Sequence, residues 1–193
     1  ATTEIYTLPL HDALPISGVV NAPTPAGFIT GNVDGTRRMV AAAANQGVRR
    51  FVHVSSLSAR EPDLSLYGKS KALAEDEVCK SSLDWTMARP PGVYGPGDLE
   101  MRDVFRMAKL GFVVLPPAGR VPLVHVRDPP RPLVAMAENG TCRPAYECHD
   151  GLAGGHSHAQ IARLVRGPTG PPPHAVHLPA APLPPTSLPH QTP

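Results

Sequence analysis

The sequence lacks the features that mark a membrane-spanning or nucleic-acid-binding protein. None of its apolar runs approaches the ~18 residues of a membrane span. Lysine and arginine form no cluster beyond short pairs such as Arg37-Arg38 and Arg49-Arg50, and the formal net charge is only +2. We therefore expect neither a nucleic acid nor a membrane as a partner.

Cysteine is scarce, and its pattern excludes a disulfide framework. The three cysteines, Cys79, Cys142 and Cys148, are odd in number and show no CxxC spacing. They favour a reducing, cytoplasmic location, although a Cys142–Cys148 bridge stays open. Cysteines and histidines gather late in the chain, at Cys142, Cys148, His149, His156 and His158. Their spacings match no standard zinc site, so no metal is expected.

Proline, in contrast, is abundant and unevenly placed. The chain contains 25 prolines, where an average chain of this length has about 10. Ten of them fall within residues 168–193, which we expect to form a disordered or extended tail because proline cannot continue a helix or a central strand. At the other end, residues 1–17 resemble a translated sequencing adaptor rather than a secretory signal. They are predicted to be a non-native leader, the alternative being an ordinary flexible N-terminus.

Between these ends, short apolar runs alternate with helical patterns. The expected strands are 18–22, 50–54, 84–89 and 121–126, and the expected helices are 33–46, 67–80 and 98–109. Asn32 is the expected N-cap of the first helix, and Gly47 its stop. Strands that alternate with helices of this length predict βαβ units and an α/β fold with a parallel sheet.

The strongest chemical motif is Tyr67-Gly-Lys-Ser-Lys71 at the start of a helix. Residues i and i+4 share a helix face, so the phenol and the ammonium can point into one cleft. A nearby cation lowers the pKa of a tyrosine from its usual ~10. With a hydroxyl from Ser55 or Ser56 to orient a substrate oxygen, the set suits alcohol–ketone interconversion by hydride transfer. In the alternative interpretation, Lys71 pairs with Glu75 on a solvated face and Tyr67 is a boundary aromatic.

Four segments, in order between Asn32 and Asp128, resemble the extended branch of the short-chain dehydrogenase/reductase superfamily, which contains NAD-dependent epimerases, dehydratases and related reductases. They read NVDGTRRMVAAAANQGVRRFVHVSS, YGKSKALAEDEV, DWTMARPPGVYGPGD and VPLVHVRD. The resemblance implies a Rossmann-like doubly wound parallel sheet, an NAD or NADP cofactor and a small-molecule substrate that is a secondary alcohol or ketone. It also implies a possible homodimer of the intact protein.

The resemblance further implies roles for single residues. Tyr67 would be the acid/base, and Lys71 would bind the nicotinamide ribose and lower the tyrosine pKa. Ser56 matches the catalytic hydroxyl, and Asn32 matches a helix asparagine near the active site. Cofactor contacts would come, in addition, from Ala22, Ser55, Pro90, Pro91 and Val93. Their plainer roles are a helix cap for Asn32, turn formers for the serines and a strand terminator for the prolines.

The sequence also departs from that family. It has no glycine-rich turn between a first strand and helix, the turn that binds the pyrophosphate. Residues 92–97 are glycine-rich but precede no immediate helix, and about 30 residues before Asn32 leave no room for two βαβ passes. Prolines within residues 129–132 would break the next family helix. We therefore expect a partial Rossmann sheet that lacks its N-terminal strands.

The predicted organisation has four parts. Residues 1–17 form the leader, 18–128 half of an NAD(P)-binding domain, 129–167 a remnant of a substrate-binding region and 168–193 the proline-rich tail. The resulting prediction is an oxidoreductase or epimerase fragment with a Ser-Tyr-Lys site, inactive as an isolated chain. The alternatives are a non-catalytic Rossmann-like scaffold or regulatory nucleotide-binding protein, and a reading frame without function.

Overall fold

The computed structural model describes residues 18–96 without a break. Its other described segments are 13–16, 106–107, 110, 112–115, 119–128, 130–139, 144–152, 154–157, 160–161, 163 and 174–177. These residues belong to two units. The first contains the described residues up to Pro90 together with Pro130–Glu147, and the second contains those of Pro91–Pro129 and Cys148–Pro184.

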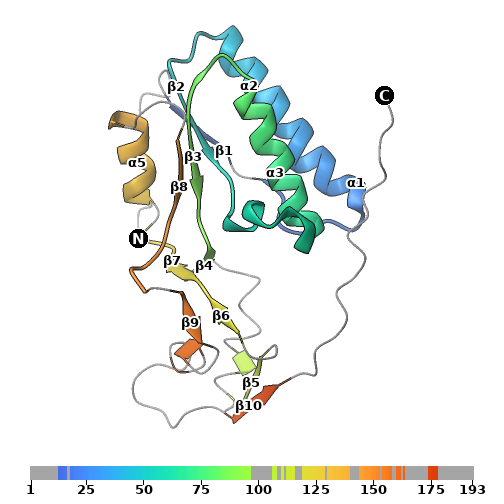
Figure 1. The fold of residues 1–193 in the computed structure, drawn as a ribbon, viewed down its shortest axis with the longest axis vertical. Coiled ribbons are helices and arrows are strands. Elements are labelled where there is room, and N and C mark those ends of the chain that lie inside the picture. Colours follow the sequence, from blue (N-terminus) through green and yellow to red (C-terminus); the bar gives the residue numbers. More distant parts are fainter. Residues whose placement is uncertain are drawn as a thin grey trace. The chain divides into compact units, whose positions relative to one another are not determined.

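The first unit is built on a four-stranded parallel sheet in the order β1-β2-β3-β8. The strands are β1 (Ala13–Ile16), β2 (Arg50–Val54), β3 (Asp84–Arg89) and β8 (Ala145–Glu147). One face is covered by α1 (Pro25–Phe28), the π-helical segment η1 (Ile29–Asp34), α2 (Gly35–Asn45) and α3 (Leu66–Cys79) (Figure 1). The other face is covered by α5 (Pro130–Asn139). Helices on both faces are what a parallel sheet requires, and the predicted α/β fold is confirmed.

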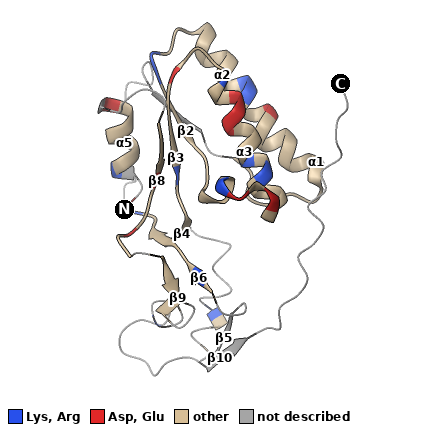
Figure 2. Ribbon diagram, in the orientation of Figure 1, with Lys and Arg blue, Asp and Glu red and all other residues tan. Residues whose placement is uncertain are grey.

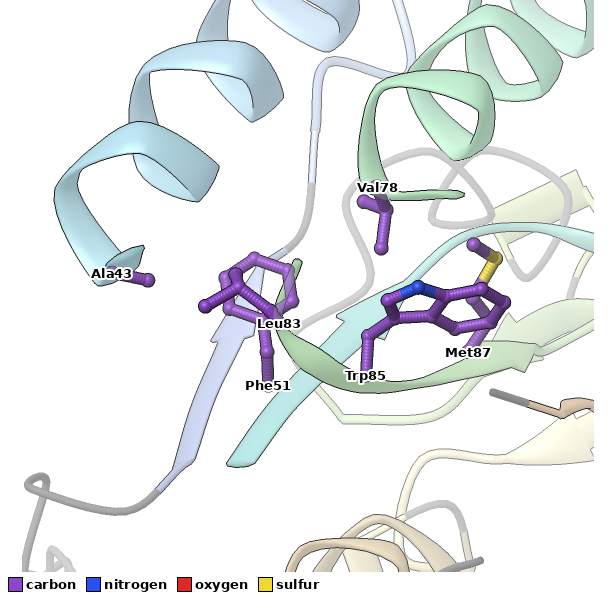
Figure 3. Close-up of a cluster of buried hydrophobic side chains, with 6 residues drawn as sticks. All are labelled: Ala43, Phe51, Val78, Leu83, Trp85 and Met87. Atoms are coloured by element: carbon purple, nitrogen blue, oxygen red, sulfur yellow. The ribbon is translucent and has the colours of Figure 1, made fainter. Parts of the chain in front are cut away.

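Side chains of β2 and β3 alternate between these two helical layers, as the two-residue period of a strand dictates. Phe51 and Trp85, which are paired in the sheet register, point toward α2 and α3. The core of this layer consists of Ala43, Phe51, Val78, Leu83, Trp85 and Met87 (Figure 3). Phe51 is fully buried, and burial of each large side chain of this kind contributes ~1.5–3 kcal/mol.

The opposite face of the sheet holds a buried polar group. Arg50 donates from Nη1 to Asp84 Oδ1 at 2.7 Å and from Nε to the Met136 carbonyl at 3.1 Å, and it also donates to Thr86 Oγ1. Asp84 lies directly opposite Arg50 in the β2–β3 register. One guanidinium therefore joins the start of both strands to α5, and it satisfies polar groups that would otherwise be buried unpaired.

The second unit consists of three two-stranded pairs. β4 (Gly92–Tyr94) lies parallel to β7 (Leu123–His125), and β6 (Arg120–Val121) lies antiparallel to β9 (His156–Ser157). β5 (Phe112–Leu115) lies parallel to β10 (His174–His177). The described residues thus include a short strand within the tail that was predicted to be disordered or extended, and the rest of 168–193 lies outside them.

Most of the predicted elements are present. The strands predicted at 50–54 and 84–89 are β2 and β3, the helix predicted at 67–80 is α3, and the strand predicted at 121–126 is divided into β6 and β7. Gly47 follows the end of α2 with φ of +65°, a left-handed conformation that glycine adopts without strain. Of the helix predicted at 98–109, only residues 106–107 are described, and they are helical.

The prediction at the start of the fold was wrong. Residues 18–22 form a loop in which Val19 and Val20 are exposed, and the strand is β1, within the segment predicted to be a leader. The helix begins at Pro25 behind the cap Thr24, whose side chain accepts from the Gly27 amide. Asn32 is therefore not an N-cap but lies inside the helical run.

The prolines near residue 130 were also misjudged. Pro130 and Pro132 lie in the first turn of α5 instead of breaking a helix. Amide groups of a first turn have no acceptor within the helix, so proline sacrifices no hydrogen bond there. Consequently Pro130–Glu147 completes the first unit with α5 and β8, although these residues were predicted to belong to a substrate-binding remnant.

No helix in the described part of the chain combines the length and apolar character needed to span a bilayer. The charged residues of α2 are basic, whereas α3 carries both acidic and basic residues (Figure 2). Arg37 of α2 pairs with Glu77 of α3 at 2.9 Å. Cys148 is a free thiol, and Cys142, the other cysteine of the bridge that the sequence leaves open, lies outside the described residues.

Candidate active site

Helix α3 presents Tyr67 and Lys71 one turn apart, near its N-terminus. The helix starts at Leu66 because Ser65 caps it: the Ser65 hydroxyl accepts from the Gly68 amide at 2.9 Å. Tyr67 is half-buried, whereas the Lys71 side chain is only 2% exposed. The Lys71 ammonium donates to the Val54 carbonyl at 2.8 Å, which places it at the carboxyl end of β2. That end of the strands is where open α/β sheets bind their ligands.

The alternative of a solvated Lys71–Glu75 pair does not fit this geometry. Glu75 is buried, and its carboxylate accepts two hydrogen bonds from Arg89, at 2.9 and 2.6 Å, and one from the Ser55 hydroxyl at 2.5 Å. Both Lys71 and Glu75 thus point inward toward β2 and β3. The sequence signal for this network was weak, since Arg89 was visible only as the residue before Pro90.

The two serines after β2 do different things. The Ser55 hydroxyl donates a hydrogen bond to the Glu75 carboxylate. The Ser56 oxygen accepts from the Ser58 amide at 3.2 Å and caps the short 3-10 turn η2 (Leu57–Arg60). Among the described residues the Ser56 proton has no acceptor, so it can be donated to a ligand.

The turn after Ser56 lies directly against the first turn of α3. A Cβ atom at Gly68 would come within 2.6 Å of the Ser58 carbonyl oxygen, so only glycine permits this approach. The Leu57 amide also donates to the Pro90 carbonyl at 2.9 Å. Ser56, Pro90 and the first turn of α3 are therefore brought together at one end of the sheet.

Asn32 connects α3 to the loop that follows β1. Its side-chain oxygen accepts from the Val19 amide at 2.6 Å, and its side-chain nitrogen donates to the Val19 carbonyl at 3.0 Å and to the Ser70 hydroxyl at 2.8 Å. A Cβ atom at Gly18 would meet Asn32 Oδ1 at 2.0 Å and lie 3.6 Å from Lys71 Nζ. Asn32 therefore holds the loop close to the Lys71 ammonium.

Electrostatics at this end of the sheet are dominated by burial. Burial lowers the pKa of Lys71 to about 8, and the neighbouring Glu75 carboxylate acts in the opposite direction. Burial, and then the Lys71 charge, lower the pKa of His53 to about 4. Neither ring nitrogen of His53 has a hydrogen-bond partner among the described residues. Sequence reasoning missed His53, although a histidine inside the apolar run 51–54 was a visible signal.

The remaining predicted site residues are distributed over both units. Ala22 is half-buried in the loop before α1. Pro91 is buried and Val93 exposed in the second unit, where Val93 lies on β4. Thus α3, η1 and the end of β2 unite Asn32, Ser55, Ser56, Tyr67 and Lys71 within the first unit, whereas Pro91 and Val93 belong to the second.

The histidines of the second unit form no metal site. Among the described residues, no three His, Cys, Asp or Glu side chains are arranged to hold an ion. His156 instead pairs with Asp150 at 2.5 Å. Cys142 and His158 lie outside the described residues.

Comparison with known proteins identifies a family model and two curated relatives that resemble this chain. A family model described as NAD(P)H-binding matches residues 11–102, so the match, like β1, begins inside the predicted leader. Ceramide reductase from Caulobacter vibrioides is 37% identical over 166 residues, which cover 85% of this chain and 52% of the relative. Sterol-4-alpha-carboxylate 3-dehydrogenase (decarboxylating) from Saccharomyces cerevisiae is 32% identical over 124 residues, 53% of this chain and 34% of the relative.

The fold has solved counterparts as well. MoeE5 in complex with UDP-glucose and NAD superposes with a TM-score of 0.71 at 23% identity, over 86% of this chain and 65% of that chain. The NAD(P)H-binding family model, the two curated relatives and this fold fit the extended short-chain dehydrogenase/reductase family. It spans about half the length of the curated relatives that it matches. The prediction of NAD or NADP as the cofactor agrees with the family description.

The residues present fit one end of that cofactor. An ammonium can donate three hydrogen bonds, and the buried Lys71 uses one of them, to Val54, among the described residues. Two of its donors therefore have no partner among the described residues, as a ribose-binding lysine requires. The given sequence contains no glycine-rich turn of the kind that binds a pyrophosphate.

Proposed function

We propose that this chain supplies the catalytic half of an NAD(P)-dependent oxidoreductase that interconverts a secondary alcohol and a ketone. The observation that carries the proposal is the Lys71 ammonium, buried at the end of β2 with donors to spare, one turn from Tyr67 and near Ser56. Tyr67 is the proton donor and acceptor for the substrate oxygen. The Ser56 hydroxyl, which has no acceptor among the described residues, orients that oxygen by donating a hydrogen bond to it.

Lys71 has two tasks in this site. It holds the ribose hydroxyls next to the nicotinamide, and its positive charge favours the phenolate form of Tyr67. The cofactor, when bound, supplies or accepts the hydride. Pro90 lies beside η2 and borders the proposed site. We propose that Ala22, Ser55, Pro91 and Val93 complete the cofactor contacts.

The substrate class follows from the relatives only as a proposal. The curated relative with 37% identity is a ceramide reductase, which favours reduction of a ketone. Epimerisation or dehydration of a sugar nucleotide is the second possibility, supported by the fold of MoeE5, which was solved with UDP-glucose. A homodimer of the complete protein and a cytoplasmic location stay predictions.

We expect the isolated chain to be inactive, because it has no pyrophosphate-binding turn. The decisive test supplies this turn. The part of ceramide reductase that precedes the matched stretch is joined to residues 13–193, and NADPH consumption is followed with a panel of ketones. We expect turnover that Tyr67→Phe lowers ~10²–10⁴-fold, the usual contribution of an acid/base residue. Tyr146→Phe, at an exposed tyrosine of β8, is the matched control and should retain full activity.

The alternative, a non-catalytic scaffold or regulatory nucleotide-binding protein, makes a different prediction. The chimera would then bind NADPH, which fluorescence titration detects, but would consume none with any ketone or sugar nucleotide. Equal activity of the chimera and its Tyr67→Phe variant would also contradict the proposed role of the phenol.

A further inference from the structure

Helix α3 carries a third functional side chain one turn beyond Lys71. Tyr67, Lys71 and Glu75 are spaced at i, i+4 and i+8, so they follow one another along the same face of the helix. A buried carboxylate is costly unless it is paired and hydrogen-bonded. Glu75 is only 7% exposed, and the three hydrogen bonds that it accepts meet this requirement.

The donors to Glu75 come from two different strands. Arg89, the last residue of β3, donates from Nε and Nη2 to the two carboxylate oxygens at 2.9 and 2.6 Å, a bidentate geometry. Ser55, directly after β2, donates at 2.5 Å. The carboxylate is thereby fixed in place on the inner face of α3, and the Ser55 hydroxyl points toward the helix.

The Lys71 ammonium lies in the same buried layer. Its one described acceptor, the Val54 carbonyl, carries no net charge. A negative charge that stabilises the buried ammonium must therefore come from another side chain. The titratable side chains around the pair are His53 of β2, Arg89 of β3 and Cys79 of α3. Two more carboxylates lie nearby, but Glu147 acts on Arg89 and Asp76 acts on Cys79. Among the described residues, Glu75 is the carboxylate that acts on Lys71.

We propose, on the basis of the function proposed above, that Glu75 is a positioning residue that keeps Lys71 protonated and in register with Tyr67. It also binds the Ser55 hydroxyl, which leaves the Ser56 hydroxyl to the substrate. Glu75 touches neither substrate nor cofactor. It acts through Lys71, whose ammonium would otherwise lose its proton in the buried layer closer to neutral pH.

The direction of the Lys71 pKa supports this arrangement. Burial alone pulls the pKa of Lys71 down, and Glu75 is the group that opposes the decrease, leaving the value at about 8. Loss of the Glu75 charge is therefore expected to lower the Lys71 pKa by on the order of one unit, since an opposite charge within ~4–6 Å shifts a pKa by 1–3 units.

The chain offers a direct test that requires no cofactor. It contains four lysines, Lys69, Lys71, Lys80 and Lys109. Isotope labelling of lysine therefore gives few side-chain NMR signals, and the Lys71 signal is assigned by its loss in Lys71→Met. We expect a titration midpoint near 8 in the wild-type chain and one about a unit lower in Glu75→Gln, which keeps the shape and the hydrogen-bond acceptor.

Two further variants make the test specific. Asp76→Asn removes an exposed carboxylate from the next position of α3, and it should move the midpoint by less than ~0.3 units because solvent screens that charge. Arg89→Met removes the competing cation and should raise the midpoint, which provides a second reading should Glu75→Gln fail to fold. Backbone amide spectra report folding for each variant.

An unchanged Lys71 midpoint in Glu75→Gln, or equal shifts in Glu75→Gln and Asp76→Asn, would overturn the positioning role. Such a result leaves the proposed function standing, because the titration involves no hydride transfer. Conversely, an inactive chimera would overturn the proposed function. A shifted titration midpoint would still show that Glu75 sets the protonation of Lys71.

Discussion

His53 should make the stability of this protein fall as the pH is lowered. The imidazole lies on β2 with 1% exposure, and in the described part of the chain neither of its ring nitrogens has a hydrogen-bond partner. Burial first, and the Lys71 charge second, lower its pKa from 6.5 to about 4. Protonation of His53 in the folded state is thus unfavourable, whereas the unfolded chain protonates it freely.

The magnitude follows from linkage. Between pH 6.5 and 4 the unfolded state binds the proton that the folded state refuses, so the free energy of unfolding decreases as the pH falls through this window. The loss is about 2 kcal/mol at pH 5 and about 3 kcal/mol at pH 4, and it levels off below that value. Whole domains are stable by only ~5–15 kcal/mol, so this loss is easily measured.

Urea denaturation at several pH values provides the assay. Trp85, the single tryptophan, is buried in the core next to Met87 and reports unfolding of the first unit by fluorescence. His53→Met should remove most of the decrease between pH 7 and pH 5, and it should be at least as stable as wild type at pH 7 because it buries no unpaired nitrogen.

His149→Gln is the matched control, since His149 is exposed and lies in the second unit. It should keep the wild-type pH dependence. If His53→Met still loses about 2 kcal/mol between pH 7 and pH 5, the reasoning is refuted and other groups cause the acid sensitivity.

Three further results are expected. Titration calorimetry of the 193-residue chain should show no low-micromolar Kd for NAD or NADP, because no glycine-rich turn is present to bind the pyrophosphate; such a Kd would contradict this. Phe51→Ala should cost ~3–5 kcal/mol in urea denaturation, whereas Met39→Ala on the outer surface of α2 should change stability by less than ~0.5 kcal/mol. Arg50→Met removes the donor to the Met136 carbonyl, so amide exchange in α5 should accelerate about tenfold for each ~1.4 kcal/mol lost; unchanged exchange would show that packing alone holds α5.

The sequence determined the elements whose patterns are local. The apolar runs at 50–54 and 84–89 were strands, the YxxxK segment was a helix with both residues on one face, and Gly47 ended α2. Each of these depends on side-chain period or on backbone conformation over a few residues, which the sequence displays directly.

Predictions failed where context beyond the local pattern decided the outcome. The run 18–22 has strand-like composition, but Asn32 holds Val19 in a loop through a contact across 13 residues. The prolines near 130 break a helix only if they lie inside it, and α5 begins at Pro130. Neither distinction is encoded by propensity alone.

The candidate site likewise depends partly on local sequence and partly on tertiary packing. The sequence by itself pointed to the residues that we propose for the chemistry, Tyr67, Lys71 and a serine, because reactive groups are identified by type and spacing. Only the tertiary structure decided that Lys71 is buried and that Glu75 binds Arg89 and Ser55 rather than facing solvent. It also left the Ser56 hydroxyl without an acceptor among the described residues. These properties arise from the packing of α3 against two strands that are distant in sequence, and burial and pairing set the charge state of a side chain.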